Sequence, residues 1–377
     1  MNNGEHDNTM NIRYISPRHG RFLEEFEIGA VYQHPWEVTV DGGIVALCAG
    51  SFLDATPVFA SAAYARELGF RDRPVHPLTL LNFGLSFSVH DVSEQAIAHL
   101  AYAKAGFANA CFAGDTIHAS STVLGVKPTS EGARGVVHVR TVVRADDQRV
   151  VCDFERKVLV KAAGNANRST AVRGVARPMA LDGPQAGAGM PALFDRALPP
   201  RSAKGAFAGF FEDFSAGDVI CHEGGRTVGE SEHMQLTCLF RNTHPLHFDE
   251  PCARSGFAGT RVVYGGLVFA WIVALASRDT SGNALWEIRY ENGAHPAGVV
   301  AGDTLYAASR VVRCEERNAD AGDVTFKLVG TKNVKPSVLL DAGADLFADE
   351  FGKRDQAARV KDKVFEIERT VLMRRRA

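Results

Sequence analysis

The sequence lacks the features of membrane-inserted, secreted and nucleic-acid-binding proteins. Its longest apolar run, residues 265–276, is too short for a membrane-spanning helix, which needs roughly 20 residues. Residues 1–18 are polar and contain no apolar signal core, so we expect no secretory leader. The formal net charge is only -2, which argues against a general nucleic-acid surface. We therefore expect a cytoplasmic protein without a membrane or nucleic-acid partner.

Cysteine and cofactor motifs are also missing. The 7 cysteines form no C-x-x-C pair, and their odd number and irregular spacing favour reduced thiols over a disulfide framework. His244 and His247 are three residues apart, but no convincing cysteine or carboxylate pattern beside them completes a metal site. There is no P-loop, and no Gly-x-Gly-x-x-Gly follows an expected strand. We expect no metal and no redox or nucleotide cofactor.

What the chain contains instead is a copy of itself. Its 377 residues, 46% hydrophobic and 23% charged, fit a globular protein with two domains. Residues of the first half recur 188 positions later: Ala65-Arg66 matches Ala253-Arg254, and Gly114-Asp115 matches Gly302-Asp303. An offset held over about 90 residues indicates a duplicated fold.

The repeat divides the chain into four segments. We expect a flexible start at 1–19, a first unit at 20–162 and a second unit at 206–377. Residues 163–205 lie between the units and are rich in Ala, Gly, Pro and Ser. Because they have no periodic apolar face, we expect a linker there.

Both units show the same order of expected elements. A short strand ends near Val40 or Val228 and a helical stretch follows. A strongly apolar segment at 78–89 or 267–276 then predicts a central buried helix. Segments rich in β-branched residues predict strands at 136–143, 151–160, 324–331 and 364–373, with an insertion between the last two. One buried helix and an antiparallel sheet, present twice, make an α+β fold.

The two copies differ at the centre of the repeat. Residues 54–59 are Asp-Ala-Thr-Pro-Val-Phe, whereas 242–247 are Asn-Thr-His-Pro-Leu-His, so only the second copy ends this segment with a histidine. The second copy continues with Val-Tyr-Gly-Gly-Leu at 263–267 and Ala-Gly-Asp-Thr-Leu at 301–305.

On these motifs the chain resembles the MaoC-like hydratases. That family has a tandem (double) hot-dog fold, in which each domain wraps a curved antiparallel sheet around a central helix. The Asn-Thr before His244 and the Val-Tyr-Gly-Gly segment are most similar to the mesaconyl-CoA hydratase branch, also called β-methylmalyl-CoA dehydratases.

The resemblance implies addition of water to an α,β-unsaturated thioester, which needs a base for water and a donor for the enolate oxygen. His247 is the candidate base, because the ordinary pKa of histidine lies near neutrality. Gly265, with Gly266 beside it, precedes the apolar helix, where a glycine N–H is an oxyanion donor that a ligand can approach closely. The alternatives are that His247 is a satisfied buried histidine and that the two glycines only begin a helix.

Asn242 stands where the common family pattern has an Asp that shares the acid–base work. An amide does not ionise, so we expect Asn242 to position water while His247 handles the protons. Tyr264 and Gly266 are expected to contact the substrate. A dicarboxylic substrate also needs a cation, and Arg241 is the distinctive candidate because Leu53 takes its place in the first copy.

The first copy does not meet the same demands. Phe59 replaces the histidine, and Pro77, which has no N–H, replaces the glycine. We expect this copy to be a scaffold and a wall of the acyl-CoA pocket, with Asp54 as a capping residue of its turn.

The sequence therefore predicts a hydro-lyase that reversibly hydrates mesaconyl-CoA or a related short, branched enoyl-CoA, with CoA present only as part of the substrate. One alternative is a tailoring dehydratase on a carrier- or CoA-bound chain, which an open apolar tunnel would favour. Another is a non-catalytic acyl-CoA-binding protein, which the missing Asp suggests. Hot-dog units pair through their sheets, so the chain carries one pair internally, and we expect a further homo-oligomer.

Overall fold

The structure, a computed structural model, describes residue 15 and residues 17–164, 189–199, 209–350, 352–353 and 358–376. Most of the predicted flexible start at 1–19 and most of the predicted linker at 163–205 lie outside the described residues. The described part of the linker contains a short 3₁₀ helix, η4 (Ala192–Asp195), whose Phe194 is only 2% exposed. A single buried aromatic residue produces no periodic apolar pattern, so the apolar periodicity of the sequence did not indicate that this segment packs against the core.

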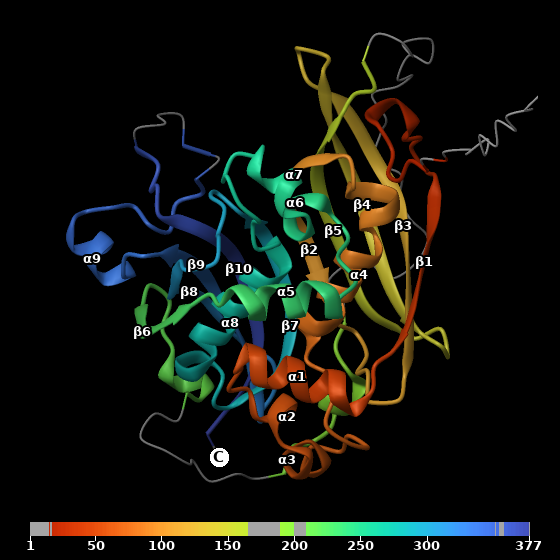
Figure 1. Cartoon of the computed structure of the whole chain (residues 1–377). Helices are drawn as coiled ribbons and strands as arrows, with labels where there is room; N and C mark the ends of the chain where they lie inside the picture. The colour runs from red at the N-terminus through yellow and green to blue at the C-terminus, as the bar shows by residue number, and fades with distance from the viewer. Residues whose placement is uncertain are drawn as a thin grey trace, which may run out of the picture.

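Each half of the chain runs through the same order of elements (Figure 1). A 3₁₀ turn and a strand lead into a group of short helices, a central helix follows, and four strands complete the half. The first half consists of η1 (Leu23–Glu25), β1 (Val31–Thr39), α1 (Gly42–Phe52), α2 (Pro57–Ala60), α3 (Ala62–Glu67), α4 (Pro77–Phe87), β2 (Ala96–Gly106), β3 (Thr116–Pro128), β4 (Arg134–Ala145) and β5 (Val150–Lys161), with a π-turn, η2 (Val89–Ser93), after α4.

The second half repeats this order with one addition. The helix α9 (Pro336–Asp341) lies in the predicted insertion between its last two strands. The elements are η5 (Phe211–Asp213), β6 (Val219–Thr227), α5 (Glu230–Leu239), α6 (Pro245–Phe248), α7 (Glu250–Arg254), α8 (Gly265–Thr280), β7 (Ala284–Ala294), β8 (Thr304–Glu316), β9 (Ala321–Lys332), α9 and β10 (Lys363–Arg374).

The ten strands that the structure describes form one antiparallel sheet, in the order β1-β3-β4-β5-β2-β7-β10-β9-β8-β6. The halves join where β2 pairs with β7, and Tyr102 lies opposite Gly293 while Ala105 lies opposite Tyr290. The offset of the repeat exchanges these two pairs, so the halves are related by a pseudo-two-fold axis through this junction.

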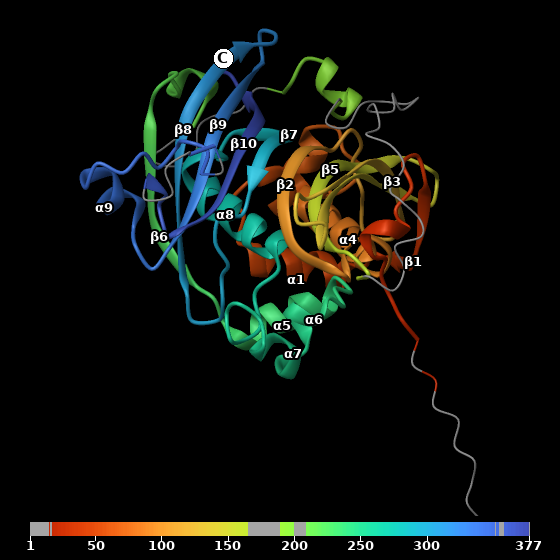
Figure 2. The same ribbon diagram turned by 90° about the horizontal axis from the view of Figure 1, so that it is seen from above.

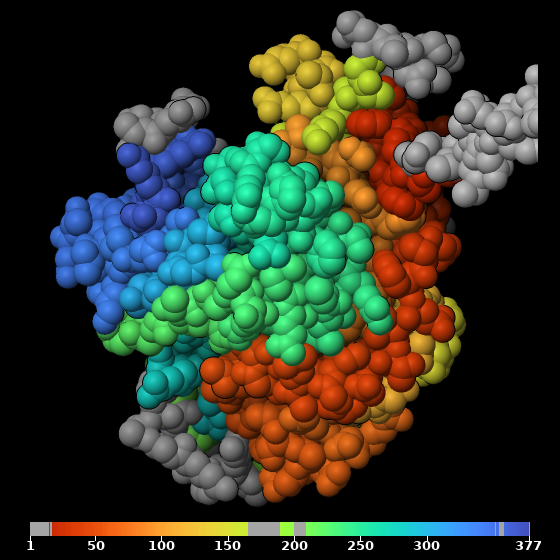
Figure 3. Space-filling model, in the orientation of Figure 1, coloured from red at the N-terminus to blue at the C-terminus, as the bar shows by residue number. Residues whose placement is uncertain are grey.

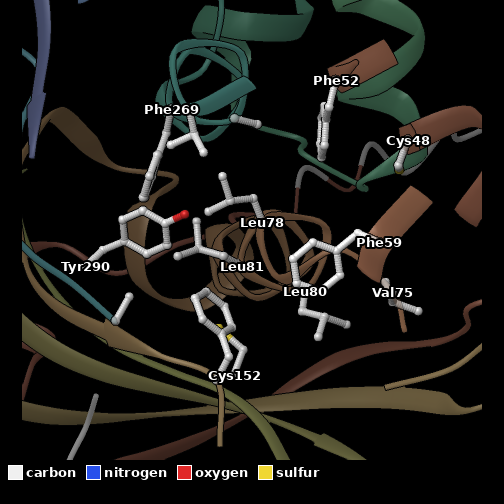
Figure 4. Close-up of a cluster of buried hydrophobic side chains, with 14 of the residues drawn as sticks. Cys48, Phe52, Phe59, Val75, Leu78, Leu80, Leu81, Cys152, Phe269 and Tyr290 are labelled. Carbon is white, nitrogen blue, oxygen red and sulfur yellow. The ribbon is translucent and has the colours of Figure 1, made fainter. Parts of the chain in front are cut away.

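The sheet curves around the two central helices, α4 and α8, which touch each other near the junction (Figure 2). Every residue of α4 is buried, as the continuous apolar segment predicts. Leu78, Leu80 and Leu81 of α4 pack into one cluster with aromatic side chains from both halves (Figure 4). Full burial of each such side chain stabilises the fold by about 1.5–3 kcal/mol. The α+β prediction is therefore confirmed.

Both halves hold the start of the sheet to the central helix with the same polar clamp. In the first half the ring of His34 bridges Asp91, at 2.9 Å, and Ser121, at 2.7 Å. The second half repeats this arrangement with His222, Asp279 and Ser309. Although the residue types match a catalytic triad, the clamp occurs in both copies and its histidines and serines are buried, so it is structural.

The central segment of each half makes a hydrogen bond to the other half. The N–H of Ala55 donates to the hydroxyl of Ser277 at 2.8 Å. In the opposite direction, the ring of His244 bonds to the carbonyl of Ala96 at 3.2 Å. The helices α5–α7 consequently cover the front of the molecule between the two halves, where they appear in green in Figure 3. Any cavity beneath these segments is built from both copies.

A buried ion pair ties the second half together at the junction. Arg369 of β10 is 1% exposed and Glu287 of β7 is fully buried, and the guanidinium Nε donates to the carboxylate at 3.0 Å. Arg369 also donates to the hydroxyls of Thr280 and Ser281, and Tyr290 donates to Glu287. All the strong donors of this cluster therefore have acceptors inside the protein.

Replacement of Glu287 by Gln should destabilise the protein strongly. The change removes the carboxylate that pairs with the buried Arg369 cation and leaves only the longer-range charge of Asp54, and loss of one partner of a buried pair costs about 3–5 kcal/mol. Urea unfolding monitored by circular dichroism measures the loss. The double variant Glu287→Gln/Arg369→Met removes both charges and should recover much of the stability. A loss below about 1 kcal/mol in the single variant would show that the pair does not matter.

Candidate active site

A cavity of ≈ 470 Å³ lies between the two halves, within the range of about 300–1,000 Å³ that is usual for ligand pockets. The second half contributes the segment before and within α6, the entry to α8 and the turn after β7. The first half contributes the end of α4 and parts of β2 and β5. Five of the six predicted site residues line this cavity: Asn242, His247, Tyr264, Gly265 and Gly266.

His247 is fixed in one tautomer by its backbone partner. Its Nδ1 lies 2.7 Å from the carbonyl oxygen of Val262, so Nδ1 carries the proton and donates it. The N–H of Val262 in turn bonds to the carbonyl of Leu246 at 3.1 Å, which holds the short helix α6 against this segment. The other ring nitrogen, Nε2, is left as a lone-pair acceptor. This is the arrangement that a general base needs.

The surroundings keep His247 neutral. Burial, with a smaller effect from the ring of His244, lowers the pKa of His247 to about 3. The two rings lie with centroids 5.2 Å apart. Nε2 is therefore unprotonated throughout the neutral pH range, but a pKa this low makes it a weaker base than the near-neutral histidine that the sequence led us to expect. Among the described residues, Nδ1 of His247 has a hydrogen-bond partner and Nε2 has none.

Asn242 and His244 shape the turn that leads to His247. The Oδ1 of Asn242 accepts the N–H of His244 at 3.1 Å, so its NH₂ group is the part left for a ligand or water. His244 Nδ1 accepts the N–H of Leu246, and Nε2 therefore carries the proton that goes to Ala96. His244 is thus a turn-holding residue, whereas Asn242 is 5% exposed and faces the cavity.

Gly265 is the first residue of α8, which has 16 residues. The first N–H groups of a helix have no partner inside it, and the helix dipole makes them good donors to an oxyanion. A Cβ at Gly265 would lie 2.6 Å from Nε2 of His295, and one at Gly266 would lie 2.3 Å from Oδ1 of Asn82. Both positions favour glycine because neighbouring side chains approach the helix start so closely.

The first half supplies wall residues that the sequence motifs did not indicate. His99 and Tyr102 of β2 and Arg156 of β5 line the cavity, as does His295 after β7. Arg156 is 4% exposed and pairs across the strands with Tyr102. The sequence does contain a sign that Arg156 belongs to the repeat, because Glu155-Arg156 recurs as Glu368-Arg369. The insertion before β10 changes the offset between these two pairs, so the constant offset of 188 does not reveal the match.

The equivalent space in the first copy is filled. Phe59 takes the place of His247 and packs against Trp286 with centroids 5.4 Å apart, and Trp286 corresponds to Ala98. The rings of Phe70 and Phe194 also pack against the indole. Figure 4 shows Phe59 among the buried side chains around α4.

Asp54 of the first copy accepts the N–H of Thr56 at 2.8 Å and so caps its turn. Its second carboxylate oxygen lies 3.5 Å from His76, in the buried interior. Phe59 and Trp286 are buried in the core cluster around this position, and Pro77, which has no N–H, begins α4 where Gly265 begins α8.

Arg241 is the predicted site residue that does not reach the cavity. Its side chain is exposed and lies over the ring of Trp36, with the guanidinium carbon 5.5 Å from the ring centroid. Arg241 and Leu53 both have a left-handed backbone, with φ of 63° and 58°. This shared backbone conformation turns residue 241 outward, although its difference from Leu53 suggested a role in binding.

None of the helices that the structure describes is long and apolar enough to cross a membrane. All seven cysteines lie among the described residues and are free thiols.

A family model described as mesaconyl-CoA hydratase matches residues 8–339 of this chain. The chain is 33% identical to a mesaconyl-CoA hydratase of Cereibacter sphaeroides over 83% of its length and 90% of the relative. It is 30% identical to a β-methylmalyl-CoA dehydratase of Chloroflexus aurantiacus over 85% of its length and 95% of the relative.

Solved structures agree with the fold. A Chloroflexus aurantiacus protein described as a MaoC domain dehydratase superposes with a TM-score of 0.79 at 28% identity, covering 95% of this chain and 98% of the other. A conserved protein of Mycobacterium tuberculosis with a double hot-dog fold superposes with a TM-score of 0.69 at 20% identity, covering 94% and 98%. The double hot-dog prediction is confirmed.

The histidines around the cavity should make the protein less stable in mild acid. Burial lowers the pKa of His99, His244, His247 and His295. In the unfolded chain each has its ordinary pKa of about 6.5, so below that pH the unfolded state binds more protons than the native state. The free energy of unfolding should therefore fall by at least about 1 kcal/mol between pH 7 and pH 5.

Urea unfolding at several pH values tests this expectation. Wild type should show a clear slope between pH 5 and 7, and His295→Gln, which removes one of the four groups, should show a smaller one. The expectation is wrong if the two proteins have the same slope or if wild type has none.

Proposed function

Because this chain belongs to the mesaconyl-CoA hydratase family, we propose that it reversibly adds water to mesaconyl-CoA or a closely related short, branched enoyl-CoA. One observation carries the proposal. The unprotonated Nε2 of His247 and the helix-start N–H of Gly265 belong to one cavity between the halves. These are the base and the oxyanion donor that hydration of a thioester requires.

The reaction follows from these two groups. The thioester oxygen accepts the N–H of Gly265, which polarises the double bond. Nε2 of His247 removes a proton from water as the water oxygen bonds to Cβ, and the π electrons move onto the thioester oxygen as an enolate. The imidazolium then returns a proton to Cα as the enolate collapses. Water is the only co-reactant, and the reverse sequence is dehydration.

Asn242 positions water in this scheme. Its oxygen is engaged by the N–H of His244, so its NH₂ group is free to donate to the water oxygen. One lone pair of that oxygen then accepts the amide N–H, a water proton is oriented toward Nε2 of His247, and the other lone pair is left for Cβ. Because an amide does not exchange protons, His247 is the single acid–base group of the mechanism.

His247→Ala should lower kcat by about 100-fold or more, the contribution of a positioned acid–base group. The measurement is loss of enoyl absorbance with a panel of enoyl-CoA thioesters of increasing chain length, together with a thermal melt that checks the fold. Asp54→Asn is the matched control from the filled copy, and it should keep most of its turnover.

Three results would contradict the proposal. Near-normal turnover of His247→Ala would show that His247 is not the base. An equal collapse in Asp54→Asn would place chemistry in the first copy. Tight acyl-CoA binding without turnover of any thioester would make the protein a non-catalytic binder. A preference for long chains would instead favour a tailoring dehydratase.

A further inference from the structure

Arg156 is a buried cation that the hydration chemistry does not use. It is 4% exposed and lines the cavity, yet no Asp or Glu is among the residues of the cavity wall. Its Nη2 donates to the hydroxyls of Ser88, at 2.7 Å, and Ser93, at 3.4 Å. Its Nε is buried and has no hydrogen-bond partner among the described residues. A buried guanidinium without a counter-charge is costly, so its presence requires an explanation.

The second half contains an equivalent arginine, Arg369, which is paired within the protein. Arg156 lies opposite Tyr102 across β5 and β2, and Arg369 lies opposite Tyr290 across β10 and β7. Ser93 and its counterpart Ser281 each accept a hydrogen bond from the arginine of their half. The two arginines are therefore structural equivalents.

Their charged neighbours differ. Arg369 is neutralised by Glu287, with which its Nε makes a 3.0 Å hydrogen bond. Asp54 is also close enough for its charge to favour the cationic form of Arg369. Around Arg156, His99 of the first half stands in the place of Glu287, and Asn242 of the second half stands in the place of Asp54. Both anions are thus replaced by groups without negative charge around Arg156.

We propose that Arg156 binds the free carboxylate of the acyl group, and that this carboxylate takes the place that Glu287 occupies beside Arg369. The inference rests on the proposed hydration of an enoyl-CoA, and it adds the residue that selects a dicarboxylic acyl group. A guanidinium suits this task because its donors match the two oxygens of a carboxylate.

The surroundings of Arg156 fit a ligand anion. Burial lowers its pKa to about 10, so the guanidinium stays charged at neutral pH. Burial also lowers the pKa of His99 well below its ordinary value, so this ring remains neutral and does not repel an anion. Both ring nitrogens of His99 lack partners in the described structure, and a carboxylate oxygen is an acceptor for the nitrogen that carries the proton.

The position also fits the geometry of the reaction. In mesaconyl-CoA the carboxylate is attached to Cβ, the carbon that water attacks. Its binding group must therefore lie near the base. The charge of Arg156 acts on His244, whose ring is 5.2 Å from that of His247 between centroids. A cation at this point also offsets the repulsion between the substrate carboxylate and the developing enolate.

Two thioesters that differ only at this group test the proposal. They are mesaconyl-CoA and (E)-2-methylbut-2-enoyl-CoA, in which a methyl group replaces the carboxylate. Arg156→Met should lower kcat/KM for mesaconyl-CoA by about 100-fold or more, the usual loss for a desolvated charge pair. The methyl analogue should change by less than about 5-fold, because it makes no ion pair. Arg66→Gln, an exposed arginine paired with Asp72, is the control and should leave both values unchanged.

A second variant tests the proposal without removing the buried side chain of Arg156. His99→Glu places a carboxylate where Glu287 stands in the other half, so it should occupy Arg156 from within the protein. We expect a melting temperature at or above that of wild type, together with the same selective loss of mesaconyl-CoA turnover. An equal loss for both thioesters in both variants, or no loss in either, would overturn the proposal.

Binding separates this proposal from the proposed function. Calorimetric titration with methylsuccinyl-CoA, the saturated analogue of mesaconyl-CoA, measures the carboxylate contact without any reaction. If wild type hydrates neither thioester, the hydratase proposal fails. The contact is still confirmed if Arg156→Met weakens binding of this analogue about 100-fold, and it is refuted if binding is unchanged.

Discussion

The pairing of β2 with β7 is the constraint on which the rest of the molecule depends. It joins two copies of one fold through a pseudo-two-fold axis, as the exchanged pairs Tyr102–Gly293 and Ala105–Tyr290 show. Because the central segment of each copy crosses to the other half, each potential site needs elements from both. Neither half would form a complete cavity without this junction.

The duplication lets one copy serve as a reference for the other. At three matched positions the filled site has Phe59, Trp286 and Glu287 where the open site has His247, Ala98 and His99. The aromatic side chains occupy the volume that an acyl group would need, and the carboxylate neutralises the arginine. The first site is thus filled by aromatic side chains and its arginine is paired, whereas the second site has a cavity and an arginine whose Nε has no partner among the described residues.

Sequence patterns predicted the local parts of this architecture well. Apolar periodicity predicts the central helices and the later strands. The candidate site residues at 242–247 and 263–266 could be predicted because they lie close together in two short segments of the sequence. The strand β2 was not predicted, because Ala96–Gly106 is rich in alanine, which favours helices in isolation. Arg156 was missed for a related reason, since its place in the cavity depends on strand pairing across the chain. The sequence suggested a role for Arg241 in binding because it does not show the left-handed backbone conformation that turns this residue outward.

The amide at position 242 follows from the same charge balance. Although burial opposes ionisation, His76 and then Arg369 hold the pKa of Asp54 below its ordinary value, so that copy contains an acid close to its arginine. An ionised Asp at position 242 would likewise be close to Arg156, where it would compete with a substrate carboxylate for the guanidinium. Asn242 keeps the polar contact to the turn without adding that charge. In the function that we propose, a site for a dicarboxylic acyl group has no second acid–base residue, and His247 both accepts and returns the proton.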